Sequence, residues 1–297
     1  MRRKVRADKE SVGTGAAISR AKAAPSAAVP WRPEQLPPFP AIALKALNLI
    51  AGRDTSLLEL CDLIRPDPAF STAILKIANS PLVAFSRNIT SVVQASMLLG
   101  FQRLKSIVIT VGLKAYLQGP VAPALEACWR HSVACAAIAE RAAGRGLDRD
   151  FAYTAGIMHD IGRAAMAAAA PATYMRVVET EADDPRDLLP REREQFGLDH
   201  CETGASLVKL WNLPGAFLEI TARHHAYPSR PADTESIVAS SCLLADTLGF
   251  GMTKYRAAPS YADVLATFGE AARNELPENA ETLAAEIATE IQVIEAV

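Results

Sequence analysis

Helix-forming stretches that are broken at short intervals by proline, glycine and capping residues constrain the fold of this 297-residue chain most strongly. Leu57, Leu60 and Ile64, for example, recur at the spacing that places apolar side chains on one face of an α-helix. Pro66-Asp67-Pro68 ends that helical pattern, because proline removes a backbone donor and disfavours helix at the residue before it. Strand patterns are weak in the N-terminal half of the chain, and helical spacing continues beyond it, so the sequence predicts an all-α, multi-helical bundle.

The same pattern predicts where individual helices lie. Ser91 is expected to cap a helix that ends at Gly100, and Gly162 is expected to end the helix that carries His159. The run Ala164–Ala170 is compatible with a helix or a tight turn. In the second half, helices are predicted near 122–143, 150–160, 171–182, 186–196, 200–211, 214–225 and 234–248, with one or two more in 259–297, split at Pro277.

Composition along the chain predicts three parts. Residues 1–30 contain almost no large apolar side chains, so they are expected to form a disordered tail, whose basic residues leave contact with nucleic acid or anionic lipid as an alternative. The main domain is predicted over 31–250, with an N-terminal helical part at 31–118 and a second part at 119–250. Residues 251–297 are expected to form a C-terminal helical extension.

Bulk charge and apolar content exclude several classes of function. The formal net charge of −2 provides no dense positive field for general nucleic-acid binding, although the helix-turn-helix-like spacing around 66–78 keeps that hypothesis open. No run of 18 apolar residues and no secretory signal is visible, so a cytoplasmic protein that does not contact membrane is expected. The five cysteines form no C-x-x-C pair, which is typical of free thiols in a reducing compartment.

All five histidines lie beyond residue 130, and one of them, His159, is followed directly by Asp160. Adjacent helical residues point about 100° apart, so this pair can approach one ion from two sides near a helix end. Imidazole and carboxylate ligands without a thiolate suit Mn, Fe, Zn, Ni or Mg. The alternative is a polar seam between helices, in which the same side chains are hydrogen-bonded without metal.

Several short motifs carry a resemblance to a known family. The histidine and aspartate motifs of the second half resemble, in their order along the chain, the HD superfamily of helical metal-binding proteins. These motifs are Trp129-Arg130-His131, Gly156-Ile157-Met158-His159-Asp160-Ile161-Gly162, Asp199-His200, His224-His225 and Ala245-Asp246. Earlier stretches resemble one branch, the HDOD family of bacterial signalling proteins: Leu36-Pro37 with Phe39-Pro40, Ile64-Arg65-Pro66-Asp67-Pro68, Lys76-Ile77-Ala78-Asn79-Ser80, Ile89-Thr90-Ser91-Val92 and Leu99-Gly100 with Arg103-Leu104. The resemblance implies an N-terminal helical subdomain packed on an HD-type helical core.

The resemblance also implies a ligand set. In HD-type sites, the positions of His131, His159, Asp160 and Asp246 hold one divalent metal ion. In the related two-metal HD-GYP phosphodiesterases, the carboxylate matching Asp160 bridges to a second ion held by further histidines. The residues that match these further histidines are His200, His224 and His225, and Glu192 is implied as an additional ligand or supporting partner. One or two ions are therefore expected.

Two functions follow from the resemblance. HD-GYP enzymes continue their paired histidines with a glycine-tyrosine-proline signature, whereas this chain reads Ala226-Tyr227-Pro228, so the substrate-binding loop of those enzymes is not matched. HDOD proteins are regarded as non-catalytic output or scaffold modules. The leading hypothesis is therefore a regulatory module with a signalling-protein partner and a nucleotide or metal in its pocket. The rival is a metal-dependent phosphodiesterase or other phosphohydrolase.

Overall fold

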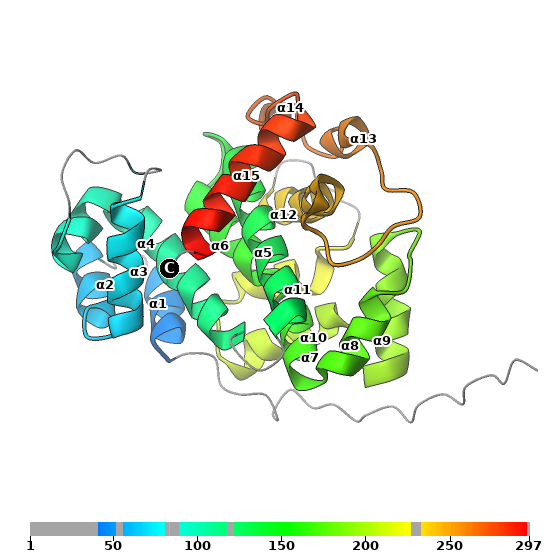
Figure 1. Ribbon diagram of the computed structural model, residues 1–297, viewed down its shortest axis with the longest axis horizontal. Coiled ribbons are helices and arrows are strands. Elements are labelled where there is room, and N and C mark those ends of the chain that lie inside the picture. The colour runs from blue at the N-terminus through cyan, green and yellow to red at the C-terminus, as the bar shows by residue number, and fades with distance from the viewer. Residues whose placement is uncertain are drawn as a thin grey trace, which may run out of the picture.

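The structure, a computed structural model, describes residues 41–51, 56–80, 83, 89–117, 122–226 and 233–295. Throughout these residues the fold is helical, with an N-terminal lobe at one end and a larger body that carries the histidines (Figure 1). The all-α prediction is confirmed. The expected disordered tail at 1–30 lies outside the described residues, and the predicted domain division stays a prediction.

Four helices build the N-terminal lobe. They are α1 (Ala41–Ala51), α2 (Leu57–Ile64), α3 (Pro68–Ala78) and α4 (Val92–Leu117), and α4 contacts each of the other three. Capping side chains start two of them: Ser56 forms a capping box with Glu59, and Asp67 accepts from the first backbone amides of α3. Gly100 has φ 78° inside α4, so the helix is broken where glycine predicted an end.

The larger body is organised around α5 (Ala122–Ala143), which contacts α6, α7, α12 and α15. Its alanines let neighbouring helices approach closely. A Cβ on Gly156 of α6 would lie 2.5 Å from the Cα of Ala136, so glycine and alanine are needed for this α5–α6 contact. The remaining helices are α6 (Arg149–Met158), α7 (Ile161–Ala169), α8 (Pro171–Val178), α9 (Leu188–Phe196), α10 (His200–Leu210), α11 (Ala216–Arg223), α12 (Thr234–Ala245), α13 (Tyr261–Leu265), α14 (Glu270–Arg273) and α15 (Ala280–Glu295).

The structure corrects the prediction that Gly162 ends the helix carrying His159. Helix α6 ends at Met158, His159 and Asp160 form the corner, and Gly162 lies inside the next helix, α7. Its role is close packing, because a Cβ there would lie 2.0 Å from the carbonyl oxygen of His200. The alanine-rich run 164–170 is helical through Ala169.

The ends of several other predicted helices also differ. Helix α8 stops at Val178, and the following segment pairs Ala182 with Tyr255 in an isolated parallel bridge. Helix α12 stops at Ala245, after which Asp246–Phe250 form a wider π-type turn. The C-terminal segment forms three helices, α13 to α15, where one or two were expected, and Pro277 lies between the last two.

One described stretch, Val92–Ala115, is long and apolar enough to cross a bilayer by length and composition. Helix α4, to which it belongs, is broken at Gly100 and contacts α1, α2, α3, α5 and α6. A mostly buried stretch of this kind is what the core helix of a soluble protein presents. The fold is consistent with a soluble protein, and the cytoplasmic location stays a prediction.

Candidate metal centre

Helix α5 and the α6–α7 corner bring the first candidate ligands together. His131 lies near the middle of α5, while His159 and Asp160 form the corner itself. All three side chains are fully buried. The Oδ2 atom of Asp160 lies 3.8 Å from Nε2 of His131 and 4.0 Å from Nε2 of His159. The sharp corner therefore presents both members of the His-Asp pair to the same space as His131.

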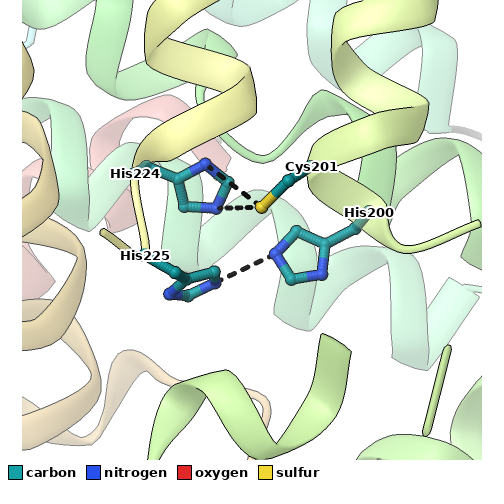
Figure 2. A group of neighbouring side chains, drawn as sticks. All are labelled: His200, Cys201, His224 and His225. Carbon is teal, nitrogen blue, oxygen red and sulfur yellow. Dashed lines mark hydrogen bonds between the residues drawn. The ribbon is translucent and has the colours of Figure 1, made fainter. Parts of the chain in front are cut away.

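The second group of histidines comes from α10 and the end of α11. Figure 2 shows His200 and Cys201 on one helix facing His224 and His225 from the other. The Nε2 atoms of His200 and His225 lie 2.9 Å apart. Asp160 joins this group too, since its Oδ1 lies 3.6 Å from Nε2 of His200 and 3.5 Å from Nε2 of His224.

Glu192 of α9 fixes the orientation of His200. Its buried Oε2 accepts both the backbone N–H of His200, at 2.8 Å, and the ring Nδ1–H, at 2.6 Å. Its other oxygen accepts the hydroxyl of Tyr174 at 3.0 Å. Glu192 therefore satisfies an N-terminal amide of α10 and leaves Nε2 of His200 directed at the cluster.

Asp246 reaches the cluster from the opposite side of His131. Its Oδ1 lies 3.2 Å from Nδ1 of His131, and its Oδ2 accepts the hydroxyl of Tyr255 at 2.5 Å. Hydrogen bonds from Ala182 to Lys254 and from Arg256 to Ala182 hold the segment that carries Tyr255. The imidazole of His131 therefore lies between two carboxylates, with Asp246 next to Nδ1 and Asp160 on the side of Nε2.

Tautomers fixed by the surrounding structure direct lone pairs into the centre. The Nδ1 of His159 donates to the carbonyl of Gly156 at 2.6 Å, and that of His224 donates to the carbonyl of Thr221 at 3.1 Å, because a carbonyl can only accept. The Nε2 atom of His159 is then an acceptor that faces the carboxylate of Asp160. Acceptors facing one another in a buried space favour a cation between them.

Buried atoms without hydrogen-bond partners lie in the same space. Among the described residues they include Nε2 of His159, Oδ1 of Asp160, Nδ1 of His131 and Oδ1 of Asp246. Ligands bound tetrahedrally at about 2.1 Å lie about 3.4 Å apart. The separations from Asp160 to His224 and His200 are 3.5 and 3.6 Å, and those to His131 and His159 are 3.8 and 4.0 Å. The described side chains therefore offer ligand atoms for a divalent metal ion beside His159 and Asp160, with His131 and His224 on either side.

Arg163 is a component that the sequence analysis did not identify. It lies one turn after Asp160 on α7, is fully buried, and places Nε 2.9 Å from Oδ2 of that carboxylate. Its Nη2 lies 3.4 Å from Nε2 of His200 and 3.5 Å from Nε2 of His225. A fixed positive charge therefore lies among the residues predicted to hold a second ion.

The ionisation of the centre follows from burial and from these neighbours. Burial lowers the pKa of His159 and of His225 well below the ordinary histidine value, so both rings are neutral near pH 7. Burial alone would raise the pKa of Asp160, but Arg163 opposes it and the pKa lies well below its usual range. Burial would likewise lower the pKa of His200, yet Glu192 raises it to about 9.

The His200–Glu192 pair predicts a pH dependence of stability. Because the pKa of His200 is about 9 in the folded protein and near 6.5 when unfolded, its contribution is complete below pH 6.5 and is lost as pH rises through 9. Metal-free Glu192→Gln should lose less free energy of unfolding across this range than wild type. Urea unfolding at pH 6.5 and above 9 measures this, with exposed Glu194→Gln as the matched control. An unchanged pH slope in Glu192→Gln would refute it.

Spacing in the sequence could have indicated two further residues of the site, Arg163 and Cys242. Arg163 follows Asp160 by three positions, which places both side chains on one helical face. Cys242 precedes Asp246 by four positions, and its Sγ lies 3.5 Å from Nε2 of His131. The sequence alone did not indicate Arg163 or Cys242 as part of the site, because arginine is not a metal ligand and the chain has no C-x-x-C pair.

A model of the HDOD domain family matches residues 36–227. The chain belongs to the HDOD family. The resemblance in the sequence is thereby confirmed. A curated relative from Treponema pallidum (strain Nichols), named only as an uncharacterized protein, is 24% identical over 87% of this chain. This chain spans about half, 51%, of the length of that relative.

Solved structures share the HDOD fold. An HDOD domain protein of unknown function from Geobacter sulfurreducens is 25% identical, with a TM-score of 0.66 over 88% of this chain and 92% of that one. A Shewanella amazonensis SB2B protein, assigned by name only as a phosphohydrolase, is 20% identical, with a TM-score of 0.63 over 89% and 94%. A Marinobacter aquaeolei VT8 protein, assigned by name only to signal transduction, is 20% identical, with a TM-score of 0.64 over 88% and 58%.

Proposed function

We propose that this HDOD protein is a non-catalytic regulatory module whose buried centre binds one divalent metal ion. Family membership supports a regulatory HD-type module, and the geometry of the centre supports a single ion. His131, His159 and Asp160 would hold this ion, which as a bound cation would supply Lewis acidity and neutralise the facing acceptors. The protein acts in the cytoplasm on a signalling-protein partner.

The observation that carries the proposal is the ion pair between Arg163 and Asp160. Two-metal phosphodiester hydrolysis needs one carboxylate shared between two ions, with both ions close to the attacking and leaving oxygens. Here the guanidinium lies 2.9 Å from that carboxylate and against two of the histidines of the second set. A second divalent ion at this place would face repulsion of several kcal/mol from the buried guanidinium.

A cavity beside the centre is the proposed entry for a small regulatory ligand. It has a volume of about 240 Å³ and lies between the 183–186 segment, α12 and the loop before α13. His224, His225, Ser240 and Thr267 are among its lining residues. A ligand in this cavity contacts the centre directly at His225. A nucleotide is the ligand class we propose, with the base in the cavity.

The rival function is metal-dependent phosphodiester hydrolysis. It is favoured by the convergence of His131, His159, Asp160 and Asp246 in one buried cluster, which is the ligand set that the HD resemblance implies. In that case the cavity beside His224 and His225 would admit substrate. The number of bound ions and the presence of turnover separate the two proposals.

Hydrolysis assays distinguish a regulator from an enzyme. Wild type loaded with Mn²⁺, Fe²⁺ or Zn²⁺ is incubated with bis(p-nitrophenyl) phosphate and with cyclic di-GMP, beside Asp160→Ala. We expect wild type and Asp160→Ala to give the same background rate, because Arg163 occupies the place of the second ion. Metal-dependent turnover in wild type that disappears in Asp160→Ala would establish the rival function and refute the regulatory one.

A further inference from the structure

We propose that Cys242 is a thiolate ligand of the metal, together with His131, His159 and Asp160. In this arrangement Asp246 positions His131 and does not touch the ion. The inference rests on the metal binding proposed above and assigns the ligands of that site. It differs from the set implied by family resemblance, in which Asp246 is a ligand and no sulfur is present.

The two nitrogens of His131 face different partners. Nδ1 lies 3.2 Å from Oδ1 of Asp246, while Nε2 lies 3.8 Å from Oδ2 of Asp160 and 3.5 Å from Sγ of Cys242. An ion bound at Nε2 therefore lies on the side of Cys242 and His159, which share one group of ligand atoms with His131, and Asp246 lies across the ring. A carboxylate on the distal nitrogen of a metal-bound histidine fixes its tautomer and raises its basicity, which is the role assigned to Asp246.

Distances around Cys242 match a metal-bound thiolate. Zinc binds sulfur at about 2.3 Å and histidine nitrogen at about 2.0–2.1 Å, so tetrahedral sulfur and nitrogen ligands lie about 3.6 Å apart. The separation from Sγ to Nε2 of His131 is 3.5 Å. The ligand atoms of His131, His159 and Cys242 all lie within 4.8 Å of one another, and all three residues are buried.

Buried acceptors in the same space favour a cation there. His159 Nε2 and Oδ1 of Asp160 are buried without hydrogen-bond partners among the described residues, whereas Oδ2 of Asp160 is paired with Arg163. Oδ1 of Asp246 and Nδ1 of His131 also lack hydrogen-bond partners, but they face each other across 3.2 Å, and the other oxygen of Asp246 accepts the Tyr255 hydroxyl. His159 Nε2 belongs instead to the group of ligand atoms that contains Cys242.

A thiolate changes which metal the centre selects. Oxygen and imidazole ligands alone admit Mg²⁺ and Mn²⁺, whereas a thiolate favours softer ions such as Zn²⁺, Fe²⁺ or Co²⁺. Cys201, a thiol in the second group of histidines, lies 4.0 Å from His224 and next to His200, which Arg163 contacts. Cys201 therefore provides a matched control for Cys242.

X-ray absorption of the zinc-loaded full chain tests the assignment without any substitution. The expected first shell holds one sulfur at about 2.3 Å and nitrogen or oxygen at about 2.0–2.1 Å. A shell of nitrogen and oxygen alone around bound zinc would overturn the role of Cys242 and leave the proposed metal binding intact. Failure to bind zinc, cobalt or iron would overturn both.

Two variants identify which thiol is bound. Sulfur should persist in Cys201→Ser and disappear in Cys242→Ser, and loss of sulfur in Cys201→Ser would overturn the assignment even where Cys242→Ser does not fold. With Co²⁺, wild type and Cys201→Ser should show a thiolate-to-cobalt charge-transfer band that Cys242→Ser lacks. Asp246→Asn should keep this band and weaken metal binding about 10- to 100-fold, as loss of a positioning carboxylate does. Loss of the band in Asp246→Asn would refute its positioning role.

Discussion

Arg163→Met should bind two divalent ions per chain where wild type binds one. The guanidinium lies 2.9 Å from Asp160 and contacts His200 and His225, so its removal frees the carboxylate and the second set of histidines. Methionine retains the apolar stem without the charge. Metal analysis of dialysed protein, with parallel calorimetric titration, measures the change. A second ion in wild type, or a single ion in Arg163→Met, would contradict the assigned role of Arg163.

The same substitution should strongly destabilise the metal-free protein. Asp160 is fully buried and would lose its cationic partner, and breaking a buried ion pair on one side costs about 3–5 kcal/mol. Metal should restore most of this loss by supplying a new cation. As a control, Arg65→Met removes an exposed arginine 3.7 Å from Asp62 and should cost at most about 1 kcal/mol. Equal losses in the two variants would show that Arg163 does not neutralise Asp160.

Gly162→Ala should give the second large effect. A Cβ at Gly162 would lie 2.0 Å from the carbonyl oxygen of His200 and 2.5 Å from the amide nitrogen of Gly204, and both of these are backbone atoms that cannot turn aside. Helices α7 and α10 must then separate, at a cost of about 3 kcal/mol or more. Urea unfolding should show this loss.

Gly146→Ala is the matched control for this packing argument. A Cβ at Gly146 would meet nothing within 4 Å, and its backbone is not in the left-handed region. Its free energy of unfolding should stay close to that of wild type. A small effect in Gly162→Ala, comparable with that in Gly146→Ala, would mean that α7 and α10 do not pack as closely as described.

Local signals in the sequence predicted the fold class and much of the helical pattern. Ser91 accepts from the backbone amide of Gln94 at the start of α4, as its capping side chain indicated, and Gly100 breaks α4. Gly162 was misread, because a glycine that ends a helix and one that admits another backbone have the same local sequence. Only the packing of α10 against α7 distinguishes the two cases, and that contact is remote in sequence.

The sequence indicated which histidines and carboxylates gather, but not how they are arranged or which other side chains join them. Histidine positions and the His159-Asp160 pair indicated which side chains gather, and the structure brings these residues together with Asp246. The sequence could not show that Asp246 faces Nδ1 of His131, since that depends on the turn after α12 and on Tyr255. It also could not show that Arg163 points inward, because an arginine on a helix is usually at the surface.

The metal content of wild-type protein purified without chelator tests the central claim most directly. With Arg163 in place of a second cation, elemental analysis should find one divalent ion per chain. Two ions per chain would contradict the role of Arg163 and favour the enzyme. No bound metal would contradict the centre itself and leave a polar seam between helices.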